Sequence, residues 1–132
     1  MGTRAVYSFI DEKDTFHVYK HWDGYPTGAI EFIDNALPYA WPLPRFEAME
    51  FSASFIAGNK SKSGGDVYIT DHWLNHGDLE YRYEIKLKEN KLWIKIYEKK
   101  YPSGKYDLFD LGFLDDLKKK YLSDEYKAVV NG

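Results

Sequence analysis

The chain has 132 residues, carries a net charge of −3 from 18 basic and 21 acidic residues, and contains no cysteine. A length of this order is typical of one domain, so we expect residues 1–132 to form a single domain. The absence of cysteine excludes disulfide bonds, thiol catalysis and thiolate-bound zinc. The acidic balance disfavours a surface built entirely for phosphate backbones. No apolar run reaches the roughly 18 residues of a membrane span, and the first apolar stretch is too short for a signal peptide, so we expect a cytoplasmic protein.

The chain begins with two runs of β-branched and aromatic residues. They predict strands at 5–10 and 15–22, joined by the polar turn Asp-Glu-Lys-Asp as a hairpin. Alternation along the second strand separates two sets of side chains. One face carries Phe16, Val18, Lys20 and Trp22, and the other carries His17, Tyr19 and His21.

Helical periodicity follows the segment "DGYPTG", whose glycines and proline turn the chain. Apolar residues spaced by three and four predict a helix over 29–37, with Thr27 as the N-cap and a proline ending it. A second apolar stripe predicts a helix over 45–57. The small and polar residues of 59–66 are typical of a solvated connector, although a mobile loop over a site has the same composition.

The second half of the chain is rich in alternating apolar and polar residues, which indicates strands. We expect four strands, at 66–70, 80–87, 91–97 and 106–111, and a final helix at 113–122. Asn90 favours a left-handed turn between two of these strands. The order β-β-α-α-β-β-β-β-α predicts an α+β fold, an antiparallel sheet of about five to six strands with the helices on one face.

The four histidines form two pairs with i, i+4 spacing, His17 with His21 and His72 with His76. On a strand that spacing separates two side chains by about 13 Å, too far for one zinc ion. The second pair lies in a loop, where it could chelate a metal together with nearby aspartates. This pattern leaves a metal-dependent hydrolase open as an alternative, although polar loops are commonly capped by His and Asp without any metal.

A His-Trp dipeptide occurs twice beside an aspartate, in "KHWDG" and in "DHWLNHGD". Each copy lies at the end of a predicted strand. If those ends meet, the side chains form one aromatic and titratable cluster, which suits ligand binding or acid–base chemistry. The alternative is that the indoles pack under loops while the histidines cap turns. No nucleophile elbow and no glycine-rich phosphate loop is present, so we predict no catalytic residue and no cofactor.

The predicted strand 91–97 presents a basic and aromatic face. This face carries Lys91, Trp93, Lys95 and Tyr97, and Arg82 and Lys86 on the neighbouring strand could extend it. Such a face suits single-stranded nucleic acid, which is a second alternative function. Lysine stems and aromatic rings also cover solvated sheets without any ligand, and the same face could form a homo-oligomer interface.

The segments "MGTRA" and "YKHWDGYPTG" resemble those of a set of small prokaryotic and phage proteins. These proteins open with Met-Gly-Thr-Arg and carry an aromatic-Asp-Gly-Tyr-Pro segment further along. The resemblance covers mainly residues 1–28, with a weaker echo at "GGDVYITD" and "EYRYEI", and the middle helices depart from it. It implies a prokaryotic or viral accessory protein without an assigned activity, and it draws attention to Arg4, Asp23, Gly24, Tyr25 and Pro26.

The sequence therefore predicts a non-enzymatic binding module of a prokaryotic cell or a virus-infected host. Its ligand is expected to be a partner protein or a small flat molecule such as a nucleotide, with nucleic acid and metal binding as alternatives. The predicted site residues are Arg4, His21, Trp22, Asp23, Tyr25, His72 and Trp73. In this hypothesis Arg4 holds an anionic group, while Trp22 and Tyr25 stack on the ligand or bury it.

Overall fold

The computed structural model describes residues 3–60 and 66–122, which form a six-stranded sheet with three α-helices. The strands are β1 (Ala5–Ile10), β2 (Thr15–Lys20), β3 (Val67–Thr70), β4 (Tyr81–Lys88), β5 (Lys91–Lys99) and β6 (Tyr106–Phe113). The helices are α1 (Pro26–Ala36), α2 (Ala48–Asn59) and α3 (Leu114–Leu122), with two short 3-10 helices, η1 (Leu37–Tyr39) and η2 (Trp73–Asn75). The predicted α+β fold and its element order are confirmed.

The sheet is mixed, which corrects the predicted antiparallel sheet at one pairing. The strand order is β3-β2-β1-β4-β5-β6, and β1 pairs with β4 in parallel while every other neighbouring pair is antiparallel. β3 therefore runs in the same direction as β1 and β4. The chain that leaves β3 has to return along the sheet and pass β2 and β1 before β4 can start. Residues 71–80 make this crossing, and we call them the crossing segment.

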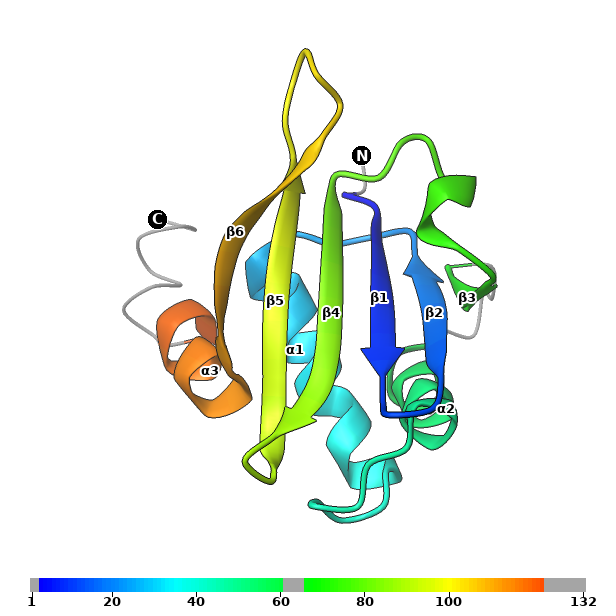
Figure 1. Cartoon of the computed structure of the whole chain (residues 1–132), viewed down its shortest axis with the longest axis vertical. Helices are drawn as coiled ribbons and strands as arrows, with labels where there is room; N and C mark the ends of the chain where they lie inside the picture. The colour runs from blue at the N-terminus through cyan, green and yellow to red at the C-terminus, as the bar shows by residue number, and fades with distance from the viewer. Residues whose placement is uncertain (1–2, 61–65, 123–132) are drawn as a thin grey trace.

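One face of the sheet packs against the helices and forms the main apolar core (Figure 1). Alternate β1 side chains meet α2 there, with ring centroids 4.6 Å apart for Tyr7 and Phe55 and 5.5 Å apart for Phe9 and Phe51. Ile30 of α1 is also fully buried in this core. The apolar side chains on one face of β1 and on one side of α1 are therefore buried in the same core, as the hydrophobic effect favours.

The helix starts differ from those predicted. Proline occupies the first turn of α1, and the N-cap is Tyr25 without a side-chain hydrogen bond, so the prediction of Thr27 as the cap is wrong. Proline suits this position because its fixed φ matches the helix and its missing N–H needs no partner. α2 starts at Ala48, later than predicted, where the backbone N–H of Ala48 donates to the Asp11 carboxylate at 2.7 Å. The cap of α2 therefore comes from the β1–β2 turn.

The corner between β2 and α1 is fixed by close packing of its backbone. The residue of this corner with a left-handed backbone conformation is Asp23, whose φ is 56°, and not the glycine that follows it. Gly24 lies so close to β1 that a Cβ there would meet the Thr3 carbonyl oxygen at 2.7 Å. Its own carbonyl accepts a hydrogen bond from the Tyr83 hydroxyl. Glycine is needed at this position because the backbone of the corner touches the sheet.

The remaining strand predictions agree with the structure to within about two residues, the usual uncertainty of such boundaries. The β4–β5 turn has positive φ at both Glu89 and Asn90, so the predicted left-handed Asn90 is confirmed. Residues 61–65 of the predicted connector lie outside the described residues. Within the described ranges, no helix combines the length and the apolar character needed to cross a bilayer.

Candidate functional site

The candidate site lies on the face of the sheet opposite the helices, which we call the open face. Side chains from neighbouring strands form two rows across it. The first row is Tyr68, Tyr19, Val6, Arg82 and Tyr97, and the second row is Thr70, His17, Ser8, Glu84 and Lys95. The open face is therefore polar and aromatic where the helix-covered face is apolar.

The crossing segment covers the first row. Leu79 is fully buried and packs with Val6 and Tyr19 in a second, small apolar cluster. η2 lies within the segment, and His72 caps it by accepting the backbone N–H of Leu74 at 3.0 Å. In Figure 1 this segment, the start of β1 and the β5–β6 hairpin lie at the same end of the sheet.

His17 of β2 contacts both β1 and the crossing segment. His17 Nδ1 lies 2.7 Å from the Ser8 hydroxyl, and the His17 and His72 rings have centroids 5.5 Å apart. Burial lowers the pKa of His17, electrostatic interaction with His72 and Arg82 lowers it further, and Asp71 opposes the shift. The neutral imidazole is therefore favoured in the folded protein.

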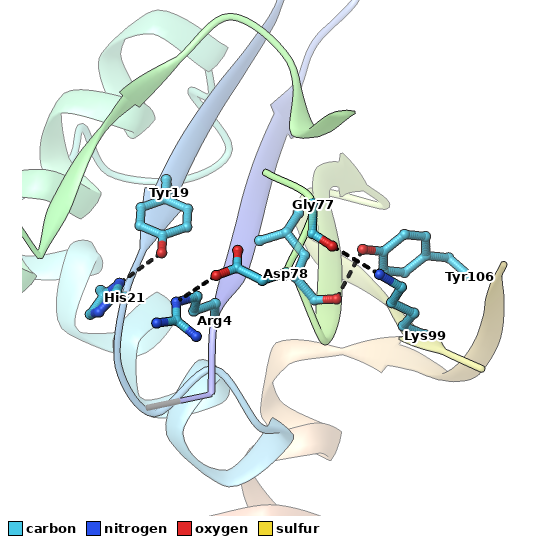
Figure 2. A network of polar contacts seen from close by, with 8 residues as sticks. Arg4, Tyr19, His21, Gly77, Asp78, Lys99 and Tyr106 are labelled. Atoms are coloured by element: carbon cyan, nitrogen blue, oxygen red, sulfur yellow. Dashed lines mark hydrogen bonds and ion pairs between the residues drawn. The ribbon is translucent and has the colours of Figure 1, made fainter. Parts of the chain in front are cut away.

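Tyr19 connects the other two histidines. Its hydroxyl lies 2.7 Å from His21 Nδ1, and its ring stacks on His76 with centroids 4.3 Å apart (Figure 2 shows the bond to His21). His76 Nε2 in turn lies 2.9 Å from the Thr70 hydroxyl. Burial lowers the pKa of His76, and the nearby carboxylates of Asp78 and Asp71 oppose the shift. All four histidines thus belong to one network that ties the crossing segment to β2.

The predicted site residues around the β2–α1 corner have partners within the protein. Arg4 Nε forms an ion pair with Asp78 at 3.1 Å, which anchors the crossing segment beside β1 (Figure 2). Trp22 is 46% exposed and packs edge-on against His21, with centroids 4.5 Å apart. The Tyr25 hydroxyl is 3.4 Å from an Asp23 carboxylate oxygen.

The structure brings the two His-Trp segments into one neighbourhood, with Tyr19 between them. His21 is linked to the crossing segment through Tyr19. Each tryptophan lies against its own histidine, with ring centroids 4.5 Å apart for Trp22 and 5.2 Å apart for Trp73, and Trp73 also packs on Arg82. The two indoles therefore do not form a single stacking surface.

Arg82 lies at the centre of the open face, under Trp73. Its guanidinium carbon is 3.9 Å from the Trp73 ring centroid, 5.4 Å from that of Tyr97 and 5.7 Å from that of Tyr106. The side chain is 14% exposed, and the nearest Glu84 carboxylate oxygen is 3.6 Å from its guanidinium. Among the described residues, Arg82 Nε has no hydrogen-bond partner. Burial lowers the pKa of Arg82, with Glu84, Tyr97 and Tyr106 opposing.

A groove of about 570 Å³ opens beside Arg82, between the crossing segment and the β5–β6 hairpin. The side chains that give it its chemistry are Trp73, His76, Arg82, Lys99, Lys105 and Tyr106. Two hydrogen bonds hold its walls together, from Lys99 Nζ to the Gly77 carbonyl and from the Tyr106 hydroxyl to the Leu79 carbonyl, both at 3.0 Å (Figure 2).

The metal and nucleic-acid alternatives gain little from the geometry. In the part of the chain that the structure describes, no three His, Asp or Glu side chains gather as a metal-ligand set. On β5, Trp93 packs edge-on against Phe113 at 4.9 Å, and the Lys88 ammonium lies over its ring at 4.0 Å. Trp93 is therefore occupied by contacts within the protein, while Tyr97 belongs to the row that contains Arg82.

Comparison with known proteins returns no relative. No family model, no curated protein and no solved structure matches the chain. The fold and site define an α+β domain with a mixed sheet, helices on one face, and an aromatic, cation-lined groove on the other. Its function has to be inferred from the chemistry of that groove.

Proposed function

We propose that the protein is a non-enzymatic binding module that takes a small flat ligand, such as a nucleotide, in the groove on its open face. We place it in the cytoplasm of a prokaryotic cell or a virus-infected host, as the resemblance of its first 28 residues implies. The observation that carries the proposal is the groove of about 570 Å³ between the crossing segment and the β5–β6 hairpin. Small-molecule sites commonly have volumes of roughly 300–1,000 Å³ and combine ring surfaces with a few polar groups.

Aromatic rings give the groove its affinity for a flat ligand. Trp73 and Tyr106 both line it, with ring centroids 5.4 Å apart in an edge-to-face arrangement. Rings held in this way lose little conformational entropy on binding and offer stacking area to a planar group. His76 adds a polar ring whose orientation is fixed by Thr70 and Tyr19.

The residues around the β2–α1 corner act in this proposal by positioning the groove. The ion pair between Arg4 and Asp78 and the stacking of His76 on Tyr19 hold the crossing segment against β1 and β2, while His21 contacts the Tyr19 hydroxyl. Trp22, Asp23 and Tyr25 form an exposed patch beside this anchor. Their contact with the ligand is secondary to that of Trp73.

A matched pair of tryptophan variants tests the proposal. Trp73 and Trp41 both lie against an arginine, with Arg45 3.6 Å from the Trp41 ring centroid, but Trp41 is not part of the groove. Nucleotide binding to the intact protein and to the variants Trp73→Leu and Trp41→Leu would be measured by isothermal titration calorimetry. We expect Trp73→Leu to abolish binding and Trp41→Leu to preserve it. Equal binding by both variants, or no binding by the intact protein, would contradict the proposal.

A protein partner is the second candidate, and the edge strand β3 favours it. Among the described strands β3 pairs with β2 alone, and its Ile69 side chain is 66% exposed. Leu74 of the crossing segment is 67% exposed. Exposed apolar side chains on an unpaired edge are typical of strand addition, by another protein or by a second copy of the chain. Light scattering of the intact protein and of Ile69→Lys would detect a dimer that the lysine prevents.

A further inference from the structure

The groove collects positive charge on a protein that is acidic as a whole. Arg82, Lys99 and Lys105 line it, and Asp107 is the one carboxylate among its lining residues, although the chain carries a net charge of −3. These three cations come from different elements: Arg82 from β4, Lys99 from β5 and Lys105 from the β5–β6 hairpin. Cations placed at random on the surface would not be expected to meet at one hollow. A cleft lined by one sign of charge concentrates ligands of the opposite sign.

The guanidinium of Arg82 lacks full hydrogen bonding within the part of the protein that the structure describes. Its side chain is 14% exposed, its closest carboxylate contact is at 3.6 Å, and Nε has no partner among the described residues. A buried guanidinium without full hydrogen bonding is costly, because the protein interior screens charge less than water does. An anion in the groove would offset this cost without having to reach Nε, because attraction between charges acts over several ångströms and needs no direct hydrogen bond.

Lys99 and Lys105 present further donors around the same hollow. Lys99 Nζ gives one hydrogen bond to the Gly77 carbonyl at 3.0 Å, and an ammonium group has three donors. Lys105 is exposed and follows Gly104, whose φ of 74° turns the hairpin. Lys100, which directly follows β5, differs from these two lysines, since it lies 2.6 Å from Glu98 and is not among the lining residues of the groove.

We infer that the groove binds a phosphate-bearing ligand, with Arg82, Lys99 and Lys105 around the phosphate and the rings of Trp73 and Tyr106 beside the flat group. This inference rests on the proposed function and names its ligand class, the nucleoside phosphates. Guanidinium and ammonium groups are the usual protein partners of phosphate oxygens. A free nucleotide fits better than a single strand of nucleic acid, because the net charge is negative and the three cations of the groove converge on one hollow.

Calorimetric titration of the intact protein with adenosine, ADP and inorganic tripolyphosphate tests the phosphate contribution. We expect ADP to bind at least about tenfold more tightly than adenosine, and 0.3 M salt to weaken ADP alone. In the double variant Lys99→Gln with Lys105→Gln, ADP should lose about tenfold in affinity while adenosine binding stays unchanged. The control Lys100→Gln should bind both ligands like the intact protein, and thermal melts verify the fold of each variant.

The possible failures are distinguishable. If adenosine and ADP bind equally and the double variant changes neither, the phosphate inference is wrong while the proposed flat-ligand site stands. If neither adenosine nor ADP binds, the proposed function fails and the inference fails with it. A titration with an oligothymidylate tests whether the groove instead binds the phosphates of a single-stranded nucleic acid. Tight, salt-dependent binding of the oligonucleotide without any binding of ADP would overturn the inference in favour of a single strand.

Discussion

The two faces of the sheet are covered by different elements and through different kinds of contact. The helix-covered face is filled by aliphatic and aromatic side chains such as Phe9, Phe55 and Ile85, which are completely buried. The open face is covered by the crossing segment, which is held by the Arg4–Asp78 ion pair, ring contacts and hydrogen bonds. Apolar burial is strong and does not depend on pH, whereas contacts between titratable groups are weaker and respond to pH and salt.

We expect the helix-covered face to supply most of the folding free energy, because its side chains are the more completely buried. In the proposed function, the rings and cations of the open face contact a ligand instead. The following predictions test that division, from the largest expected effect to the smallest.

The helix-covered face should be the more sensitive to truncation. Phe55→Ala removes a fully buried ring that packs against Tyr7 and Phe9, so we expect a loss of about 3–5 kcal/mol in the free energy of unfolding. Trp73 is half-buried on the open face, and Trp73→Ala should cost no more than about 2 kcal/mol. Urea unfolding of both variants measures the difference. A loss at Trp73 as large as that at Phe55 would remove the distinction between the two faces.

The cap that Asp11 provides for α2 should matter less, and mainly above acidic pH. Asp11→Ala removes the acceptor for the Ala48 N–H, and we expect a loss of about 1 kcal/mol at neutral pH. Hydrogen bonds from the backbone N–H groups of Ala48, Asp14 and Lys13 lower the pKa of Asp11 below its ordinary 3.8. Its contribution is therefore present above that value and disappears as the pH falls through the lowered pKa.

Urea unfolding at pH 7 and at pH 2 checks this prediction. Asp11→Ala and the intact protein should differ at pH 7 and converge at pH 2. Glu12 is an exposed neighbour in the same turn, and Glu12→Ala serves as the control that should leave stability unchanged at both pH values. A constant difference across the range would mean that the carboxylate charge does not contribute to the cap.

The open face should weaken in mild acid. Burial lowers the pKa of His17 and His76 below the ordinary 6.5, so the unfolded chain takes up protons at a higher pH than the folded one. Stability is therefore complete above about pH 6.5 and is lost as the pH falls from there toward the lowered values. The variant His17→Gln with His76→Gln should show a flatter profile of melting temperature between pH 7 and 5. An unchanged profile would show that these histidines titrate alike in both states.

The smallest effect is expected at the Arg4–Asp78 ion pair. Both side chains are partly exposed, so Arg4→Met should cost no more than about 1 kcal/mol. A double-mutant cycle with Asp78→Asn isolates the pair, and its coupling energy should fall further in 0.5 M salt. A coupling energy above about 2 kcal/mol would show that charge contacts hold the crossing segment more strongly than the comparison of the two faces allows.

The sequence by itself determined the secondary structure and the composition of the two faces. Alternation in 80–87 places Tyr83 on one side and Arg82 on the other, because side chains alternate along any strand. Helix boundaries were less predictable where a distant residue decides them. The cap of Ala48 comes from Asp11, 37 positions away, and no local signal marks it.

The tertiary structure alone decided the parallel pairing of β1 with β4, and with it the site. That pairing sends residues 71–80 back across the open face, and this crossing builds the groove between Trp73 and the β5–β6 hairpin. The histidine and tryptophan residues were conspicuous in the sequence because their types are rare. Arg82 was noted only as an extension of the basic and aromatic face of 91–97, and Lys99 and Lys105 were not singled out. Single cations on alternating strands resemble any solvated face until the fold brings them to one hollow.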